Sequence, residues 1–219
     1  MEDPPSGVTI SSALETLSRI GERRAGPPQG FSIGHVILAL MYLQQADTSS
    51  RSWLSKELGL GEGSVKTLLK RLECAGLISK TRRGNSLTDK GKSIVQSLHA
   101  KIGTPKDVEL DYVSMGEHNV AVKLAGLPIG SLNPIRLRDD AIGKGASGLT
   151  TLLVRSKQLV IPPEDFPLSM ASPSDNEILS KLGLSEGDVI LVCGASTAAQ
   201  AKRAAMEVVV SALSAYSFY

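Results

Sequence analysis

Cysteine and aromatic residues are scarce in this chain, and long hydrophobic runs are missing. The two cysteines, Cys74 and Cys193, lie far apart and have no His or Cys neighbour at metal-ligand spacing, which argues against a disulfide framework or a zinc site. Aromatic residues make up 4% of the 219 residues, so the cores must consist mainly of Leu, Val, Ile and Ala. No hydrophobic run approaches the roughly 18 residues of a membrane span, and the N-terminus lacks a secretion-signal pattern. We therefore expect a cytoplasmic protein without a membrane partner.

The formal net charge of +2 hides an uneven distribution along the chain. Residues 31–105 contain eleven Lys and Arg against five Asp and Glu, whereas residues 106–219 contain ten against thirteen. A basic segment joined to a mildly acidic one suits a division between nucleic-acid contact and a second role.

Breaks in the hydrophobic pattern divide the chain into three parts. Residues 8–24 have a helical spacing of hydrophobic residues that stops at Gly26-Pro27-Pro28, so residues 1–30 are expected to form an N-terminal helical arm. A second break at residues 103–106 separates a domain at residues 31–105 from one at residues 106–219.

The pattern of residues 31–105 predicts a winged helix-turn-helix. Ser32 is a candidate cap for a largely hydrophobic helix, residues 50–58 form the next helix, and residues 59–61 form a glycine turn. In the following helix Val65, Leu68, Leu69 and Leu72 share one face, and Gly76 is placed to end it in a left-handed conformation. A hairpin with its tip at residues 82–85 follows, and Thr88 is a candidate cap for the next helix. This order of elements is typical of a winged helix.

The expected DNA-facing residues lie opposite the hydrophobic face and on the hairpin. Lys66, Thr67, Lys70 and Arg71 are expected to face the major groove, with Ser64 on phosphate and the hairpin residues Arg82, Arg83 and Asn85 on the backbone or minor groove. A solvated helix face is the simpler explanation of such a charge run. We favour DNA because the basic face opposes the core face, small residues begin the helix, and a second basic cluster follows on the hairpin.

Two segments carry a family resemblance. Residues 59–72 read GLGEGSVKTLLKRL and follow Gly26-Pro27-Pro28 and Phe31-Ser32, and residues 138–152 read RDDAIGKGASGLTTL. In these segments the chain resembles an uncharacterised archaeal family of winged-helix proteins with a C-terminal α/β domain of unknown function. The resemblance implies a transcriptional regulator and brings no known ligand or chemistry.

The C-terminal part predicts a mixed domain of strands and helices. Strands are expected at residues 108–113, 119–124, 149–155 and 189–192, and helices at residues 175–182 and 198–213. The expected fold class is therefore α+β or α/β, with an N-terminal winged helix-turn-helix followed by a smaller mixed α/β domain.

This domain offers weak candidates for an effector site. Residues 143–148 match the pattern G-x-G-x-x-G, but a helix precedes them and a strand follows, the reverse of a dinucleotide-binding site. Arg138, Asp139 and Lys144 on a charged helix, and Ser196 and Thr197 at a strand-to-helix turn, are candidates for holding a small anionic effector. A solvated helix with internal ion pairs and an ordinary helix cap explain them equally well.

The sequence as a whole predicts a DNA-binding transcriptional regulator that binds double-stranded DNA as a homodimer. Its C-terminal domain is expected to sense a ligand or to supply the dimer contact. No arrangement of catalytic or metal-ligating residues stands out, so we expect no enzyme activity and no cofactor. Two alternatives stay open, namely a small-molecule kinase or synthase fused to a winged helix, and a winged helix used for protein contact.

Overall fold

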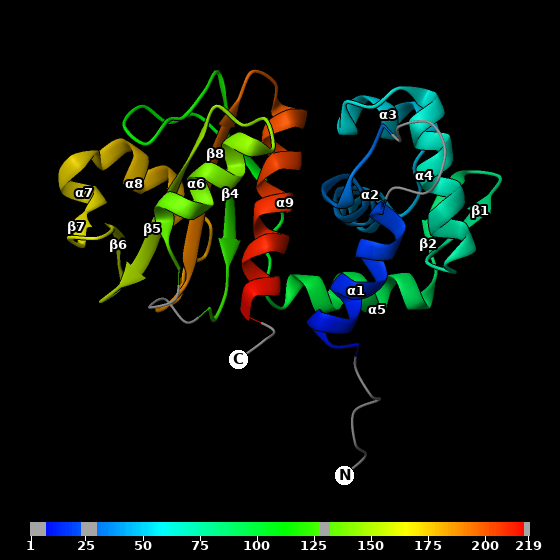
Figure 1. Cartoon of the computed structure of the whole chain (residues 1–219), viewed down its shortest axis with the longest axis horizontal. Helices are drawn as coiled ribbons and strands as arrows, with labels where there is room; N and C mark the ends of the chain where they lie inside the picture. The colour runs from blue at the N-terminus through cyan, green and yellow to red at the C-terminus, as the bar shows by residue number, and fades with distance from the viewer. Residues whose placement is uncertain (1–7, 23–29, 128–131, 217–219) are drawn as a thin grey trace, which may run out of the picture. The chain divides into compact units, whose positions relative to one another are not determined.

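A computed structural model describes residues 8–22, 30–127 and 132–216 of the chain (Figure 1). The chain divides into two compact units, Met1–Ala100 and Lys101–Tyr219. The division falls a few residues before the break expected at residues 103–106. The C-terminal unit is the larger of the two, contrary to expectation.

The N-terminal unit contains five helices and one hairpin within its described residues. In chain order they are α1 (Ile10–Gly21), α2 (Ile33–Ala46), α3 (Arg51–Leu58), α4 (Glu62–Cys74), β1 (Ile78–Thr81), β2 (Gly84–Leu87) and α5 (Asp89–His99). All the hydrophobic residues of α2 from Val36 to Leu43 are buried, so α2 is the central helix of this unit.

Side-chain caps fix where several of these helices begin. The hydroxyls of Ser50 and Thr88 accept hydrogen bonds from the backbone N–H three residues ahead, which satisfies one otherwise unpaired donor of α3 and of α5. At the start of α2 the N–H of Ser32 donates to Nδ1 of His35 at 3.1 Å. Ser32 and Thr88 are the N-cap residues of α2 and α5, as expected, and His35 is a buried polar residue whose ring pairs with the backbone of Ser32.

Helix α1 is part of the N-terminal core instead of a separate arm. It packs against α2, α4 and α5, and it buries Ala13, Leu14, Leu17 and Ile20. The expected stop at Gly26-Pro27-Pro28 lies outside the described residues.

Helix α4 has the hydrophobic face that its sequence predicts. Val65, Leu68, Leu69 and Leu72 are all buried. The N–H of Leu77 bonds the carbonyl of Leu72, and Gly76 has φ 71°, so glycine closes the helix in the left-handed conformation as expected.

The hairpin that follows α4 is short and is held to the rest of the unit. Ile78 pairs with Leu87 and Thr81 with Gly84, which leaves Arg82 and Arg83 as the tip. Asn85 in β2 forms an isolated antiparallel bridge with Ser49, between α2 and α3. Since a Cβ on Gly84 would lie 2.5 Å from the carbonyl oxygen of Ser49, glycine is required for this close approach.

The C-terminal unit is built on a six-stranded antiparallel sheet in the order β3-β4-β8-β5-β6-β7. Its elements are β3 (Lys106–Val108), β4 (His118–Leu124), α6 (Pro134–Gly143), β5 (Gly148–Arg155), β6 (Gln158–Ile161), β7 (Phe166–Pro167), α7 (Leu168–Ala171), α8 (Pro173–Ser180), β8 (Val189–Ala195) and α9 (Ala198–Tyr216). The fold class is α+β, because every strand pairing among the described residues is antiparallel, unlike the parallel pairing of an α/β domain.

Helices cover both faces of the sheet. Helix α9 packs on β4 and β8, and α6 packs on β5 and α9. On the other face Ile190 and Val192 of β8 join a hydrophobic cluster with Leu168 of α7 and Leu179 of α8. Strand β8 is therefore buried on both sides, and all seven of its residues are buried.

The strand expected at residues 108–113 is wrong in its position. Only Lys106–Val108 pairs with β4, because the N–H groups of Asp111, Tyr112 and Val113 donate to the buried carboxylate of Asp175 instead of to a neighbouring strand. In the described parts of the chain no helix has the length and hydrophobicity that a bilayer span requires.

Candidate nucleic-acid interface

The outward side of α4 carries the candidate DNA-reading residues. Lys66, Thr67 and Lys70 are exposed, and the Thr67 hydroxyl donates to the carbonyl of Gly63 at 3.0 Å. Among the described residues neither lysine forms an ion pair, so both ammonium groups are available to an external anion. The structure thus presents these three residues on one surface, as expected.

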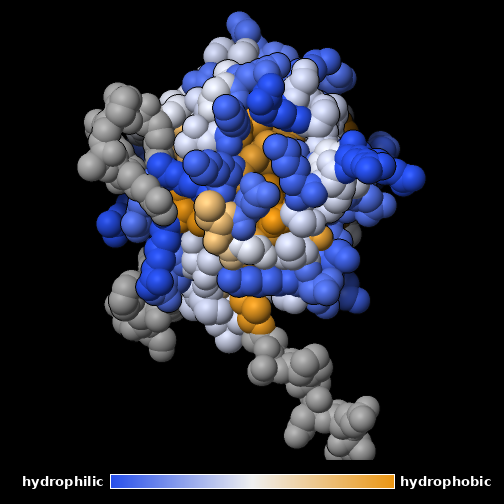
Figure 2. All heavy atoms as spheres, turned by 90° about the vertical axis from the view of Figure 1, so that its right-hand side faces the viewer, coloured by the Kyte–Doolittle hydropathy of each residue, from blue (hydrophilic) through white to orange (hydrophobic). Residues whose placement is uncertain are grey.

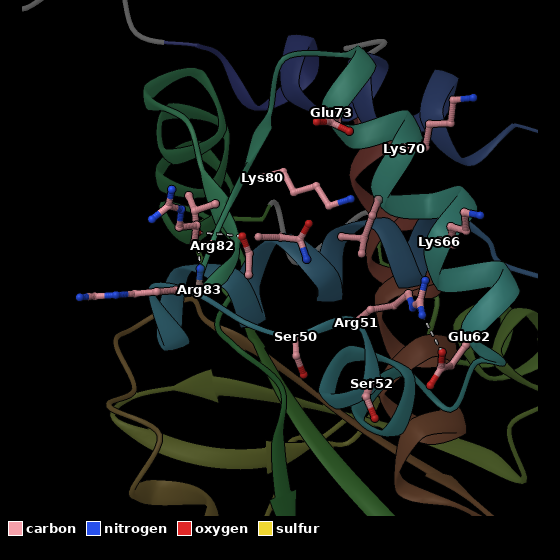
Figure 3. A pocket seen from close by; sticks show the side chains of 14 residues that line it. Ser50, Arg51, Ser52, Glu62, Lys66, Lys70, Glu73, Lys80, Arg82 and Arg83 are labelled. Atoms are coloured by element: carbon pink, nitrogen blue, oxygen red, sulfur yellow. Dashed lines mark hydrogen bonds and ion pairs between the residues drawn. The ribbon is translucent and has the colours of Figure 1, made fainter.

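A groove of about 630 Å³, which we call the hairpin groove, separates α4 from the hairpin (Figure 3). It is lined by six basic and two acidic side chains, so its balance of charge is strongly positive. The lining residues with charge are Arg51, Lys66, Lys70, Lys80, Arg82 and Arg83, with Glu62 and Glu73. A groove of this charge attracts a polyanion.

The charged groups of the hairpin groove come from both of its walls. Figure 3 shows Lys80 extending from β1 toward α4, whereas Arg83 at the hairpin tip points away from α4. Arg51 at the start of α3 forms an ion pair with Glu62 at 3.0 Å, which ties α3 to the first turn of α4. Arg82 and Arg83 are exposed, as their expected backbone contact requires.

The surface around this groove is mainly hydrophilic. Figure 2 views the molecule from the right-hand side of Figure 1, where α4 and the hairpin lie, and shows hydrophilic residues with small hydrophobic areas between them. This hydrophilic surface agrees with the charged lining of the hairpin groove.

Asn85 does not belong to the exposed wing surface that the sequence predicts. It is 9% exposed, and its side-chain N–H donates to the carbonyl of Ser49 at 3.2 Å. Because this amide holds the hairpin to the segment between α2 and α3, we assign Asn85 a positioning role and remove it from the candidate contacts.

Arg71 likewise has an internal role in place of the expected major-groove contact. Its guanidinium donates to the carbonyls of Ile20 and Glu22, both at 2.9 Å, and lies 5.1 Å from the centre of the Phe31 ring. These carbonyls are at the C-terminal end of α1, where helical partners run out. Arg71 of α4 therefore caps the C-terminal end of α1 and links the two helices.

Ser64 is only half exposed, and Gly30 lies against it. A Cβ on Gly30 would be 2.4 Å from the Ser64 hydroxyl oxygen, so the backbone at Gly30 passes directly over this side chain. Ser64 is thus less accessible to a phosphate than the sequence suggests.

A second groove, which we call the α1 groove, lies on the other side of α4 and has a volume of about 730 Å³. Its lining residues are Thr16, Arg19, Ile20, Thr67, Lys70, Arg71, Cys74, Ala75 and Lys90. Four of them are basic, and among the described residues none that lines it is acidic. Lys70 lines both grooves, so the positive surface continues across α4.

Sequence reasoning missed Arg19, Arg51, Lys80 and Lys90. Their charge was visible, but their positions depend on contacts between distant segments. For example, the ammonium of Lys90 reaches the carbonyl of Ala75 at 3.0 Å, which places it at the C-terminal end of α4. Such a contact follows from the packing of α5, which periodicity alone does not show.

The effector candidates of the C-terminal unit fall into two neighbouring places. Arg138 and Asp139 are exposed on α6, and Lys144 follows that helix and forms an ion pair with Asp140. The carbonyl of Lys144 accepts from Arg203 of α9 at 2.6 Å, so the end of α6 lies beside the start of α9.

In the strand-to-helix turn before α9, the side chains of the turn form hydrogen bonds with the first turn of the helix. The Thr197 hydroxyl accepts from the N–H of Gln200 at 3.2 Å, as the expected cap requires, and the Ser196 hydroxyl donates to the Gln200 side chain at 2.9 Å. The order helix α6, glycine-rich turn, strand β5 is also the one expected, which excludes a Rossmann-type nucleotide site there.

Cys193 in β8 is a buried free thiol. Burial raises the pKa of its thiol to about 12, and nearby Arg203 opposes this only in part. Within residues 8–22, 30–127 and 132–216, no three His, Cys, Asp or Glu side chains gather in a way that could hold a metal ion.

Two family models match the chain. The N-terminal domain of PH0730-like proteins matches residues 35–93, and a domain of unknown function (DUF4443) matches residues 115–213. The solved structure of the hypothetical protein PH0730 from Pyrococcus horikoshii OT3 has 30% sequence identity and a TM-score of 0.71, over 84% of this chain and 94% of that chain. No curated protein matches. The expected similarity to an archaeal protein and to a C-terminal domain of unknown function is confirmed. The descriptions of the two family models and of the solved structure do not mention a winged helix.

Proposed function

The chain belongs to the PH0730-like family, and we propose, from the charge and shape of its own surface, that it is a DNA-binding transcriptional regulator. In this proposal residues 31–105 form a winged helix with α4 as the recognition helix and the β1–β2 hairpin as the wing. The observation that carries it is the hairpin groove, whose six basic side chains come from α3, α4 and the hairpin.

The arrangement of charge fits the two backbones of a DNA duplex. The major groove of B-DNA is about 12 Å wide and admits one helix, with a phosphate backbone on each side. The hairpin groove and the α1 groove flank α4 and share Lys70. With α4 in the major groove, each positive groove faces one of the two backbones.

The roles of individual residues follow from their exposure. Lys66, Thr67 and Lys70 on α4 are the base-reading candidates, because Lys donates to guanine O6 and N7. Arg82 and Arg83 contact the backbone or the adjacent minor groove and thereby position the protein more than they specify a sequence.

Fluorescence anisotropy with selected genomic DNA fragments over a series of salt concentrations tests the proposal. The double variant Lys66→Ala with Lys70→Ala is expected to weaken binding at least tenfold. It should also reduce the slope of log affinity against log salt by roughly 0.9 for each phosphate that the protein no longer neutralises. Lys181→Ala is the control for the loss of one positive charge outside the proposed surface, since Lys181 is an exposed lysine of the C-terminal unit that pairs with Glu177.

Equal affinity of the wild type and the double variant, or binding that does not respond to salt, contradicts the proposal. In that case the basic surface of α4 serves another purpose, and a stable protein partner that copurifies with the chain identifies the protein-contact alternative.

A further inference from the structure

The tip of the β1–β2 hairpin is a turn that hydrogen bonds hold in place. The N–H of Arg83 donates to the Thr81 hydroxyl oxygen at 3.2 Å, and that hydroxyl donates to the carbonyl of Gly84 at 3.0 Å. Behind the tip, the backbones of Asn85 and Ser49 exchange two hydrogen bonds, at 3.0 and 3.1 Å. The backbone that carries Arg83 is therefore held in position before any partner binds, which lowers the entropy that binding costs.

The Arg83 side chain extends outward from this turn. It is exposed, and in the described part of the chain no ion pair involves its guanidinium. Figure 3 shows that it extends away from α4, whereas Lys80 of the same hairpin extends toward α4. Both residues border the hairpin groove, but their charged groups extend in different directions from the hairpin.

The place of Arg83 on a duplex follows from the proposed function, on which the inference below rests. With α4 in the major groove, the hairpin groove holds one phosphate backbone between α4 and the hairpin. In B-DNA each backbone separates the major groove from the minor groove. A charged group that extends from the hairpin away from α4 therefore lies beyond that backbone and faces the minor groove.

We infer that the Arg83 guanidinium enters the minor groove beside the α4 site and selects A·T base pairs there. In the minor groove an A·T pair presents acceptors alone, adenine N3 and thymine O2, whereas a G·C pair adds the N2 amino donor of guanine. Because a guanidinium has donors and no acceptor, it pairs with the A·T edge and is obstructed by the guanine amino group. The narrow minor groove of A·T-rich DNA also has an enhanced negative potential, which attracts arginine further.

A phosphate contact is the simpler role for an exposed arginine, and it makes a different prediction. Every nucleotide carries the same phosphate, so a backbone contact contributes equally on all sequences. Lys80 is the residue of this hairpin for which we expect that behaviour, because it extends toward the side where the backbone lies. The two residues can therefore be compared on DNA in which the minor groove alone is changed.

Two base analogues change the minor groove and keep the hydrogen-bonding groups of the major groove. In DNA fragments that the protein binds, 2,6-diaminopurine in place of adenine adds an amino group to each A·T pair. Hypoxanthine in place of guanine removes the amino group from each G·C pair. Fluorescence anisotropy at one salt concentration compares the affinity of the full chain for the natural and the substituted duplexes.

The wild type is expected to bind the diaminopurine duplex about tenfold more weakly than the natural duplex, and the hypoxanthine duplex no more weakly. Arg83→Ala is expected to bind the natural duplex about tenfold more weakly than the wild type does. The same variant should bind the natural and diaminopurine duplexes within about twofold of one another, because the group that the added amino obstructs is gone.

Lys80→Ala is the matched control, since it removes one positive charge from the same hairpin. It is expected to weaken binding to both duplexes and to keep the wild type's ratio between them within about twofold. Circular dichroism melting of both variants shows that the fold is retained.

Salt-sensitive binding by the wild type with equal affinity for the natural and diaminopurine duplexes overturns the inference and leaves the proposed function intact. An Arg83→Ala variant that loses the same factor on both duplexes also overturns it, because Arg83 then contacts phosphate. A wild type without salt-sensitive DNA binding contradicts the proposed function itself, and the assignment of Arg83 with it.

Discussion

The guanidinium of Arg71 donates to the carbonyl oxygen of Ile20 at 2.9 Å, across 51 positions of sequence. Its neighbour on the same helix, Lys70, is exposed and lines both positive grooves. Two adjacent basic residues therefore have separate tasks, one inside the fold and one at the surface.

Arg71→Ala is expected to lower the free energy of unfolding of the N-terminal unit by about 1–3 kcal/mol. The reason is that it removes charged donors from the carbonyls of Ile20 and Glu22 and leaves the end of α1 unsatisfied. Lys70→Ala is the comparison and should change stability by less than about 0.5 kcal/mol. Urea unfolding followed by circular dichroism measures both. Equal stabilities for the two variants would show that the Arg71 contacts are not important to the fold.

The α1 groove gives a prediction about the extent of the DNA contact. Arg19→Ala together with Lys90→Ala is expected to reduce the salt dependence of DNA binding by one to two units of slope, at roughly 0.9 per phosphate contact. Hydroxyl-radical footprinting should show that protection disappears on one strand. Arg19 and Lys90 have no part in DNA binding if this variant matches the wild type while the Lys66 and Lys70 variant binds weakly.

The buried carboxylate of Asp175 predicts a sensitivity to acid. Asp175 is 1% exposed and accepts the N–H groups of Asp111, Tyr112 and Val113. Burial by itself raises the pKa of this carboxyl, but the donors outweigh burial and hold the pKa below its ordinary value of 3.8. A lowered pKa in the folded state means that the ionised group stabilises the fold above pH 3.8, and that this contribution disappears as the pH falls through the folded pKa.

Asp175→Asn is accordingly expected to cost about 2–3 kcal/mol of unfolding free energy at neutral pH. The difference between the variant and the wild type should shrink below pH 4 and stay constant between pH 6 and 8. Denaturant unfolding at a series of pH values measures it. A difference that stays the same down to pH 2 would mean that ionisation of Asp175 does not contribute.

The turn between β5 and β6 offers a stabilising substitution. Ser156 and Lys157 have φ of 50° and 62°, which ordinary residues adopt at a cost, and their N–H groups donate to Glu186 at 2.9 Å each. Ser156→Asn together with Lys157→Gly places the preferred residues in this turn and is expected to raise stability by about 0.5–1 kcal/mol. Thermal melting measures the gain. A lower melting temperature would show that the lysine side chain has a structural role that outweighs the strain.

The two cysteines should react very differently in the native protein. Cys74 is exposed in the α1 groove, while Cys193 is buried in β8 with a thiol pKa of about 12. A maleimide is therefore expected to label one thiol per native chain and two after unfolding, as mass spectrometry would show. Because the label occupies the α1 groove, a bulky maleimide should also weaken DNA binding. Cys74→Ser is the control and should bind DNA normally after the same treatment.

The parts of the fold that depend on local pattern were predictable. The hydrophobic face of α4, the cap at Thr88 and the left-handed Gly76 all follow from residues within a few positions of one another. The inward roles of Arg71 and Asn85 were not predictable, because their partners are 51 and 36 positions away in the sequence. The sequence showed that α4 and the hairpin carry basic and polar residues. Which of these side chains are exposed depends on packing against distant segments.

In the C-terminal unit the errors have similar causes. The β-branched residues near position 110 favour a strand, but the distant Asp175 takes the backbone donors that such a strand would use. Strand β6 was missed because the turn before it contains Ser156 and Lys157 in place of the glycine or asparagine that marks a two-residue hairpin turn.

The position of β8 in the sheet sets an order for assembly during synthesis. Strand β8 lies between β4 and β5, yet it is made after both, and α9 is the one described element that follows it. On the ribosome the β3–β4 pair and the β5–β6–β7 group have no common neighbour until residues 189–195 emerge. The N-terminal unit has no such dependence and can fold while the rest of the chain is still being translated. A chain stalled before β8 would therefore expose the edges of β4 and β5 that β8 covers in the complete sheet, and exposed strand edges promote aggregation.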